Sequence, residues 1–470
     1  MPVNDTPSIA VEALSVFFGA TRLLGPVSFR VAAGETLVIM GETGAGKSLT
    51  AQAILGTLPK ELRAEGRITI NGRRVDALSP ADRSALWGRD IATLPQEPWR
   101  ALDPLMRAGR QVAEAHRYVA GLPPDGARRA CVRDFETLGL EGSERRLPGT
   151  LSGGMAQRVA FAAATAGRAP ILLADEPTKG LDAERHARVV GLLAQVPDNG
   201  GALLVITHEA SVARALGGDI IVLRNGRVIE QGLTHLILAD PQDPYTRDLL
   251  AADPQTWPKS ESPEDGAVVL TAKDLAVTRG DRVLIEGFDL TLRAGERVAV
   301  TGPSGIGKTT LLDTLAGLIA PARGGVQRAK GLGRHAVQKL YQDPPAAFPP
   351  HVPLERSLRD VARLHGVTWD RVSEYLTALN LYPDLLERRP DAVSGGELQR
   401  ISVARALTVG PVVLLADEPT SRLDPITQRQ TLEMLAGITE DKGISIVLVT
   451  HHAAIAENWA HQSIALKAPA

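Results

Sequence analysis

The chain has 470 residues, which is too long for one compact hydrophobic core and suits two or three domains. Hydrophobic residues make up 44% and charged residues 23%, as in an ordinary soluble globular protein, and the net charge of −2 argues against a broad nucleic-acid-binding surface. The single cysteine excludes an internal disulfide and a cysteine-ligated metal cluster, and we interpret Cys131 as a half-buried helical side chain rather than a nucleophile.

Neither export nor a membrane span is predicted. Residues 1–14 (MPVNDTPSIAVEAL) lack a basic start followed by an apolar run. The most apolar segments, such as 171–174 and 444–449, have the length of strands and end in polar residues. If the protein acts at a membrane, we therefore expect other chains to cross it.

Residues 36–48 (TLVIMGETGAGKS) predict a strand, a glycine-rich turn and the start of a helix. They fit the pattern G-x-x-x-x-G-K-S/T, whose glycines let backbone N–H groups turn toward phosphate oxygens. The helix that follows points its positive end at the same phosphates. Lys47 adds a charge to the phosphates, and Ser48 can ligate Mg²⁺.

A second match, residues 297–309 (RVAVTGPSGIGKT), has the same setting of a strand before it and a helix after it. One match alone does not exclude a chance glycine turn, whereas two matches in equivalent settings favour nucleotide binding. The predicted phosphate-binding residues are Gly41, Gly44, Gly46, Lys47, Ser48, Gly302, Gly305, Gly307, Lys308 and Thr309.

Two apolar runs end in the same acidic pair, ILLADEPT at 171–178 and VVLLADEPT at 412–420. Each predicts a buried strand with an aspartate placed to hold a metal ion and a glutamate placed to position or deprotonate a water. A solvated acidic turn would not explain why four apolar residues precede the pair in both places. The predicted pairs are Asp175 with Glu176 and Asp417 with Glu418.

Three further motifs recur in the same order in both halves. A glutamine follows a short apolar segment, an SGG-x-x-QR segment comes next, and a histidine ends a late apolar strand. The repeated residues are Gln96, Ser152, Gly153, Gly154 and His208 in the first half, and Gln342, Ser394, Gly395, Gly396 and His451 in the second. The serine of the SGG segment precedes the aspartate of the acidic pair by 23 positions in both halves, which indicates an internal duplication.

Residues 251–267 (AADPQTWPKSESPEDGA) are rich in proline, serine and acidic residues and show no apolar period. They predict a linker between a first domain at 1–250 and a second at 268–470. Apolar strands alternate with helical patterns in both domains, so we expect an α/β fold with a mainly parallel sheet covered by helices. The second copy has fewer residues between its phosphate loop and its glutamine than the first.

Taken together, the five motifs resemble those of the ATP-binding cassette (ABC) ATPases, and the SGG-x-x-QR segment is specific to that family. The resemblance covers almost the whole chain apart from the linker. It implies two P-loop NTPase domains, each with an antiparallel β subdomain and a helical subdomain beside the core sheet. It also implies ATP and Mg²⁺ as ligands, and head-to-tail pairing of the two cassettes within the chain.

The resemblance assigns roles to the repeated residues. Metal-binding roles fall to Ser48, Asp175, Gln96, Thr309, Asp417 and Gln342, and catalytic roles to Glu176, His208, Gln96, Glu418, His451 and Gln342. Each nucleotide is expected to be closed against the SGG segment of the other cassette, and Asp182 and Asp424 match a loop that links the sites. Because both glutamates and both SGG segments are present, we expect two competent sites.

An aromatic ring before the opening glycine stacks on adenine in this family, and Phe18 matches it. The corresponding residue of the second half is Arg279. We therefore expect tighter nucleotide binding at the site of Lys47 than at the site of Lys308.

A narrower resemblance links residues 239–250 (ADPQDPYTRDLL) to cassettes that power peptide, nickel and metal-chelate importers. It implies two integral membrane permease subunits, an extracytoplasmic solute-binding protein, and a peripheral position on the cytoplasmic face of the inner membrane. The chain lacks the cysteine-bearing extension of many such cassettes, and its second half lacks a matching tail and the S-L-N/D-P motif after Gln342. We therefore expect the two halves to bind different membrane partners.

Other functions stay open. A soluble tandem cassette acting on ribosomes or nucleic acid would share the five motifs, but such proteins typically carry a long basic connector. The connector here is short and more acidic than basic, with Asp253, Glu261, Glu264 and Asp265 against Lys259. A regulatory ATPase that senses nucleotide is a third possibility. The sequence leaves the solute open among peptides, nickel, metal chelates and other small solutes.

Overall fold

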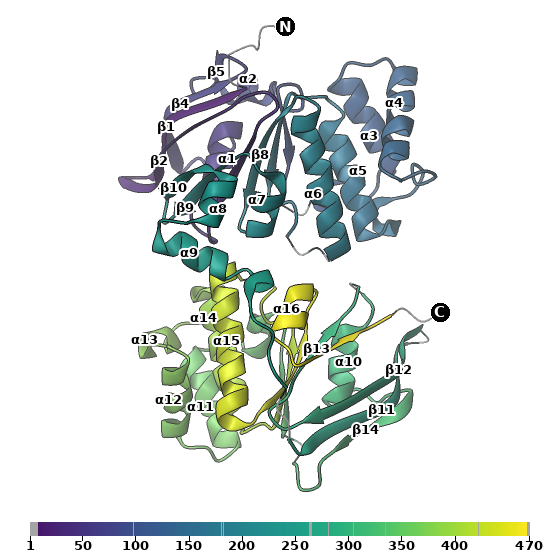
Figure 1. Ribbon diagram of the computed structural model, residues 1–470, viewed down its shortest axis with the longest axis vertical. Helices are drawn as coiled ribbons and strands as arrows, with labels where there is room; N and C mark the ends of the chain where they lie inside the picture. Colours follow the sequence, from purple (N-terminus) through teal and green to yellow (C-terminus); the bar gives the residue numbers. More distant parts are fainter. Residues whose placement is uncertain are drawn as a thin grey trace. The chain divides into compact units, whose positions relative to one another are not determined.

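The computed structural model describes residues 8–96, 98–179, 181, 183–262, 266–280, 282–303, 305–333, 335–421 and 423–467. The chain forms two compact units, Met1–Leu250 and Ala251–Ala470 (Figure 1). Each unit has a mainly parallel core sheet, an antiparallel sheet and a group of helices, which confirms the predicted α/β fold class. Among the described residues, the helices are all too short or too polar to span a bilayer.

The core sheet of the first unit has the strand order β10-β9-β3-β8-β7-β6. Five neighbouring strands are parallel, and only the edge strand β10 runs antiparallel. Every residue of β3 and β8 is buried, because helices cover both faces of such a sheet. The strands are β3 (Thr36–Met40), β6 (Ile91–Leu94), β7 (Ile171–Asp175), β8 (Ala202–Thr207), β9 (Asp219–Arg224) and β10 (Arg227–Leu233), and the helices nearby are α1 (Lys47–Leu55), α6 (Ala183–Asp198), α7 (Ala210–Leu216), α8 (Thr234–Ala239) and α9 (Pro244–Ala251).

An antiparallel sheet of order β2-β1-β4-β5 forms the second layer of this unit. Its strands are β1 (Ile9–Phe18), β2 (Thr21–Val31), β4 (Leu62–Ile70) and β5 (Arg73–Arg74), followed by the short helix α2 (Pro80–Ser84). Apolar side chains of β1, β2 and β4 join those of β3 and α1 in one core. The tight turn between β1 and β2 places Phe18 at the tip of the hairpin, where its side chain is 57% exposed.

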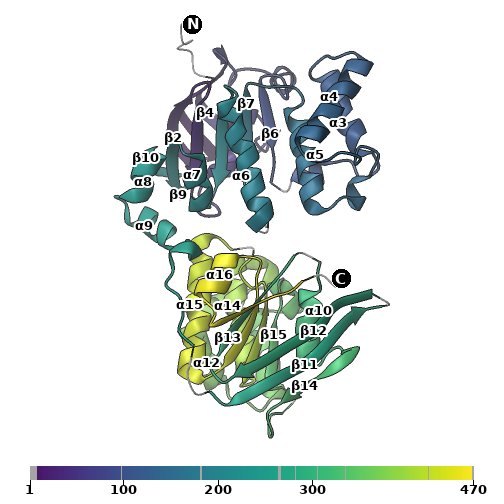
Figure 2. The same cartoon turned by 45° about the vertical axis from the view of Figure 1, so that its right-hand side comes forward.

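Three helices form a separate part of the first unit, beyond the edge strand β6 (Figure 2). They are α3 (Ala108–Tyr118), α4 (Pro124–Thr137) and α5 (Gly153–Thr165), with one-turn segments η1 (Pro98–Ala101) and η2 (Pro148–Thr150) nearby. Val112, Phe135 and Val159, one from each helix, pack in their shared core. This part carries the SGG segment, because Gly153 is the first residue of α5.

Cys131 lies in that helical core, where its thiol donates a hydrogen bond to the carbonyl of Gly109 (3.2 Å). Burial raises the pKa of the Cys131 thiol to about 11, and nearby Asp134 adds to the effect. Because the thiolate is the reactive form, the thiol is expected to react with a maleimide at neutral pH at least about a hundredfold more slowly in the folded chain than in urea. Equal labelling rates in the two conditions would show that this core is open.

The second unit has a five-stranded parallel sheet of order β15-β16-β17-β13-β18 and an antiparallel sheet of order β12-β11-β14. Between the first helix after the phosphate loop and the edge strand of the core sheet, the described residues of this unit form one strand, β14, where the first unit has β4, β5 and α2. This difference accounts for the shorter spacing in the second half. The strands are β11 (Val268–Arg279), β12 (Arg282–Arg293), β13 (Arg297–Thr301), β14 (Arg323–Arg328), β15 (Val337–Leu340), β16 (Val413–Asp417), β17 (Ser445–Val449) and β18 (Gln462–Ala465).

Helices cover this second sheet and form a second helical part (Figure 1). The helices are α10 (Lys308–Leu315), α11 (Leu354–Leu364), α12 (Trp369–Ala378), α13 (Pro383–Leu386), α14 (Gly395–Thr408), α15 (Pro425–Lys442) and α16 (Ala453–Asn458), with one-turn segments η4 (Pro344–Ala347) and η5 (Pro390–Ala392). Leu358, Leu376 and Ile401 pack in the core between α11, α12 and α14.

Part of the predicted linker is bound to the second unit. At the start of the one-turn segment η3 (Pro254–Thr256), the carbonyl of Pro254 accepts a hydrogen bond from the Asn458 side chain (2.9 Å). The Ser260 N–H donates to the carbonyl of Asn458, and the Ser260 hydroxyl accepts from Arg297 (both 2.9 Å). The segment 251–260 therefore packs as part of the second unit, while residues 263–265 of the predicted linker lie outside the described residues.

Candidate nucleotide-binding sites

The parallel sheet brings three motifs of the first unit to one edge. The phosphate loop follows β3, the acidic pair ends β7, and His208 follows β8. In register, Met40 lies beside Thr207 and Asp175 beside Ile206, so the carboxyl ends of the three strands coincide. Ligands of open α/β sheets bind outside this edge.

The phosphate loop needs glycine at defined positions. Gly41 and Gly46 have φ angles of +156° and +102°, in the region that favours glycine. A Cβ at Gly41 would lie 2.3 Å from the carbonyl oxygen of Leu223, and a Cβ at Gly46 would lie 2.7 Å from a methyl carbon of Leu24. Larger residues would therefore displace the loop from the strands that hold it.

Two buried lysines occupy the loops. Lys47 donates hydrogen bonds to the carbonyls of Gly41 (2.7 Å) and Glu42 (2.9 Å), and lies 3.6 Å from a carboxylate oxygen of Glu176. Lys308 repeats this arrangement, with its Nζ 2.8 Å from the carbonyl of Gly302 and 3.9 Å from the Glu418 carboxylate. Burial lowers the pKa of Lys47, and the negative charge of Glu176 opposes this shift.

The aspartates that end β7 and β16 lie beside the hydroxyls expected to share a metal with them; Asp417 is buried and Asp175 is partly buried. Burial raises the pKa of Asp175, and a hydrogen bond from Ser48 opposes the shift. Burial likewise raises the pKa of Asp417, against a hydrogen bond from Thr309. Oδ1 of Asp175 is buried without a hydrogen-bond partner in the described part of the chain. An orphaned carboxylate oxygen next to a hydroxyl fits a hard cation such as Mg²⁺.

The metal would need ligands from the nucleotide as well. Among the described residues, no group of three or more His, Cys, Asp and Glu side chains could hold a metal ion alone. Mg²⁺ is commonly held by one or two carboxylates together with phosphate oxygens and waters. The donor set therefore fits a metal that arrives with a nucleotide.

The glutamates after these aspartates lie against histidines. His208 Nδ1 is 3.0 Å from Glu176 Oε1, and His451 Nδ1 is 3.4 Å from Glu418 Oε2. Burial acts to raise the pKa of Glu176, but the interactions with His208 and Lys47 outweigh it and lower the pKa to about 2. Glu176 is thus a carboxylate at neutral pH. Its ionisation contributes stability above the unfolded pKa of about 4.5, and this contribution is lost as the pH falls through about 2.

Both glutamates adopt a backbone conformation that is uncommon outside glycine. Their φ angles are +47° at Glu176 and +45° at Glu418, in the left-handed region. For a residue with a Cβ this costs on the order of 1 kcal/mol, and such strain is concentrated at functional sites. The chain turns sharply at the end of each strand, which directs both carboxylates toward the lysine and the histidine.

The glutamines differ between the units. Gln342 donates a hydrogen bond to Glu418 Oε2 (3.2 Å), so the structure brings this residue into the second site. Gln96 follows β6 with an exposed side chain.

The SGG segments begin long helices. The Ser152 hydroxyl accepts a hydrogen bond from the N–H of Met155 and caps α5, and Ser394 caps α14 in a reciprocal pair with Glu397. Ser152 and Ser394 are exposed, as are Gly153 and Gly395. The N-terminus of a helix offers N–H groups to an anion. Asp424 caps α15 through a hydrogen bond from the N–H of Thr427 (3.0 Å), while Asp182 lies outside the described residues.

Sequence reasoning missed a network beside the first site. Glu209 accepts a hydrogen bond from the Thr178 hydroxyl (2.6 Å) and lies 2.8 Å from His186 Nε2. It ties the loop that carries His208 to the loop that follows Glu176. The only signal was an acidic residue directly after the repeated histidine, and the second half has His452 at that position.

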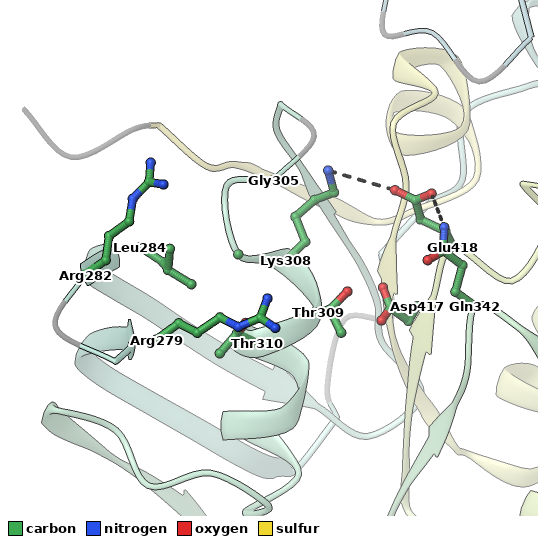
Figure 3. Close-up of a pocket in the computed structure, with 11 residues that line it drawn as sticks. Arg279, Arg282, Leu284, Gly305, Lys308, Thr309, Thr310, Gln342, Asp417 and Glu418 are labelled. Atoms are coloured by element: carbon green, nitrogen blue, oxygen red, sulfur yellow. Dashed lines mark hydrogen bonds and ion pairs between the residues drawn. The ribbon is translucent and has the colours of Figure 1, made fainter. Parts of the chain in front are cut away.

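A pocket of about 420 Å³ surrounds the phosphate loop of the second unit (Figure 3). Lys308, Gln342 and Glu418 lie at one end, with Thr309 facing Asp417. Arg279 and Arg282 line the other end, at the tip of the hairpin between β11 and β12. In the first unit, the matching hairpin positions are Phe18 and Thr21. The residues expected to contact a base therefore differ between the two sites.

Comparisons with known proteins agree with this geometry. The family model described as "ABC transporter" matches residues 24–179 and 285–421. A peptidoglycan transport ATP-binding protein, YejF, of Agrobacterium fabrum is 33% identical, with 99% of this chain and 92% of the relative covered. A glutathione import ATP-binding protein, GsiA, of Shigella dysenteriae is 30% identical, with 97% and 84% covered.

Solved structures agree in fold. An archaeal ribosome recycling factor, solved with a ribosomal stalk protein, superposes with a TM-score of 0.68 over 98% of this chain and 87% of that chain. The two sequences are 20% identical, so this likeness concerns the fold alone.

Proposed function

Because the chain belongs to the ABC transporter family, as an ATP hydrolase with two cassettes in one polypeptide, we propose that it powers the import of a small solute across a membrane. The relatives named for transport and import support the import step. The observation that carries the ATP-driven part is the repeated constellation of a buried lysine, a strand-end aspartate, and a glutamate paired with a histidine. Both copies are complete, so we propose one ATP site around each phosphate loop.

Each site would hold ATP with Mg²⁺. The loop N–H groups and Lys47 or Lys308 would bind the phosphates. Bound Mg²⁺ supplies positive charge to the phosphate oxygens. The residues that would hold the metal are Ser48, Asp175 and Gln96 in the first site, and Thr309, Asp417 and Gln342 in the second.

We propose that the glutamates act mainly by positioning the attacking water. With a pKa of about 2, the Glu176 carboxylate is a weak general base at neutral pH, yet it accepts a hydrogen bond well. For Glu418, burial acts to raise the pKa, but the interaction with His451 outweighs it and lowers the pKa. Glu176 would accept a hydrogen bond from the water and hold its oxygen toward the γ-phosphate. His208, 3.0 Å away, would keep the carboxylate in place.

We also propose that each SGG segment serves the nucleotide of the other cassette. Ser152 and Gly153 are exposed at the start of α5, and α5 lies beyond the edge strand β6. Two strands, β7 and β8, separate β6 from β3, which carries the phosphate loop. The SGG segment therefore lies away from the phosphate loop of its own cassette. The same holds for Ser394 and Gly395 at the start of α14. Their N–H groups would contact the γ-phosphate. Tethering in one chain raises the effective concentration of one cassette for the other.

The relatives guide the choice of solute and partners. Their names specify peptidoglycan transport and glutathione import, and on this basis we propose a peptide or peptide-containing solute, with nickel or a metal chelate as the alternative. The partners would be two integral membrane permease subunits and an extracytoplasmic solute-binding protein. The chain would then be a peripheral subunit on the cytoplasmic face of the membrane.

The test is affinity purification of the Glu176→Gln, Glu418→Gln chain from detergent-solubilised membranes with Mg-ATP, followed by identification of the partners. Two polytopic membrane proteins are expected. Ribosomal proteins or nucleic acid without a membrane partner would contradict the transport proposal and favour the alternative role on ribosomes. The Lys47→Ala, Lys308→Ala chain is the control, because it should not form the ATP-bound state.

The hairpin residues predict unequal nucleotide affinities. Stacking of a base on an aromatic ring contributes about 1–3 kcal/mol, so Phe18→Ala should weaken ATP binding at the first site by about tenfold or more. Arg279→Phe should strengthen binding at the second site. Binding of a fluorescent ATP analogue is measured in chains that keep one site, with Tyr118→Ala as a control because its ring is also exposed. Equal affinities of the two parental sites would count against the assignment of Phe18.

A further inference from the structure

The second site contains a buried lysine to which the five motifs assign no role. Lys339 lies on β15 with a side chain that is 6% exposed. Its Nζ is 2.7 Å from Asp313 Oδ1 and 3.6 Å from Oδ2 of Asp417. Asp417 is the strand-end carboxylate proposed to hold Mg²⁺.

Three elements of the site fix this ammonium group. Asp313 lies on α10, five residues after Lys308, and Lys339 precedes Gln342 by three residues. In the parallel sheet, Lys339 pairs in register with Leu415, two residues before Asp417. The ring of Tyr341 lies on a further side, 5.4 Å from Nζ. The position of Lys339 is therefore determined by the same strands and helix that build the phosphate site.

The first site has no counterpart of this pair. The matching positions hold Gln52, five residues after Lys47, and Thr93, three residues before Gln96. Thr93 pairs in register with Leu173, two residues before Asp175, so it occupies the same place in the sheet as Lys339. The buried cation thus distinguishes two sites whose five motifs are the same.

A fixed positive charge beside a metal-binding carboxylate competes with the metal. It neutralises part of the negative charge of Asp417 and repels a divalent cation, and both effects are strong where water is largely excluded. Asp313 pairs with the same ammonium at 2.7 Å and offsets part of its charge, so the competition with a metal depends on how close the ammonium lies to Asp417 (3.6 Å). In the first site, the charges of Lys47 and Lys179 also act on Asp175. Both ammonium groups lie 3.6 Å from Glu176, however, and the Lys179 side chain is 31% exposed, so water screens its charge more than that of Lys339.

We infer that Lys339, held by Asp313, lowers the Mg²⁺ affinity of the second ATP site relative to the first, and so makes the two sites differ in their metal requirement. This inference rests on the proposed function, because it requires Mg-ATP at Asp417. A merely structural pair between Lys339 and Asp313 would leave the Mg²⁺ dependence unchanged when it is replaced.

The experiment uses two full-length chains that each keep one site. Lys47→Ala leaves the second site and Lys308→Ala leaves the first, and binding of a fluorescent ATP analogue is followed during a Mg²⁺ titration that starts from EDTA. The half-saturating Mg²⁺ concentration should be on the order of tenfold higher at the second site. Replacing Lys339→Thr together with Asp313→Gln should remove this difference.

The reciprocal exchange is the matched variant. Thr93→Lys together with Gln52→Asp should raise the half-saturating Mg²⁺ concentration at the first site by a similar factor. Thermal melting in EDTA shows which of the two double variants are folded. If one of them does not fold, the Mg²⁺ midpoint of the other is sufficient to test the role of Lys339. Unchanged Mg²⁺ midpoints in a folded, nucleotide-binding chain would overturn the inference. Absence of nucleotide binding at the second site, with or without Mg²⁺, would instead overturn the proposed site and the inference with it.

Discussion

Replacing Glu176 and Glu418 together by glutamine is expected to reduce ATP hydrolysis by at least about a hundredfold while ATP stays bound. Glutamine keeps the size of the side chain but loses the negative charge that accepts a hydrogen bond from the water and pairs with the histidine. Positioned acid–base groups of this kind contribute about 10²–10⁴ in rate. The phosphate loops are untouched, so binding of ATP should be retained or strengthened. Phosphate release and bound nucleotide are measured on the same samples.

The matched control is Glu136→Gln with Glu433→Gln. Both glutamates are exposed on helices and lie outside the phosphate sites, so hydrolysis should stay within about twofold of the parent, as for most surface substitutions. Each single variant, Glu176→Gln or Glu418→Gln, reports how far one site depends on the other. Substantial hydrolysis in the double variant would show that another group positions the water.

The second large effect is expected from Lys47→Ala with Lys308→Ala, which should abolish measurable ATP binding. Each ammonium is buried within its loop and is already fixed by two carbonyl groups, so it is oriented before nucleotide arrives. Its removal leaves the phosphates without their nearest positive charge in a site that also contains two carboxylates. We expect a loss of affinity of at least about a hundredfold, measured by equilibrium binding of a labelled nucleotide.

Alanine also removes a buried side chain, so folding is checked by thermal melting without nucleotide. Deleting an ammonium that faces Glu176 or Glu418 removes a favourable pair but also a desolvation cost, and a small change in melting temperature is expected. Lys60→Ala with Lys273→Ala removes two exposed lysines and should leave binding unchanged. Retained affinity in the Lys47→Ala, Lys308→Ala chain would contradict the role of both loops.

The sequence predicted the parts of the fold that depend on local patterns. The apolar run 171–174 forms β7, and most of 444–449 forms β17. Glycine spacing predicted the turn between β3 and α1, because positive φ angles and a close approach to neighbouring strands demand glycine there. The duplication predicted that each such element occurs twice.

Long-range contacts between side chains were beyond sequence reasoning. The pairing of Lys339 with Asp313, and of Glu209 with His186, joins residues from separate elements and follows no periodic pattern. The left-handed conformation of Glu176 could not be predicted either, because tertiary packing rather than the intrinsic preference of glutamate imposes it. Residues 251–260 have the composition of a linker, yet hydrogen bonds to Asn458 and Arg297 order them on the second unit.

The presence of two nucleotide sites is tested by the number of ATP molecules bound by the Glu176→Gln, Glu418→Gln chain in saturating Mg-ATP, measured by equilibrium dialysis with labelled ATP. Two ATP molecules per chain are expected, and one when either Lys47→Ala or Lys308→Ala is added. Binding of no ATP, or of a single ATP that is unaffected by one of these lysine substitutions, would contradict the claim that each half of the chain builds its own nucleotide site.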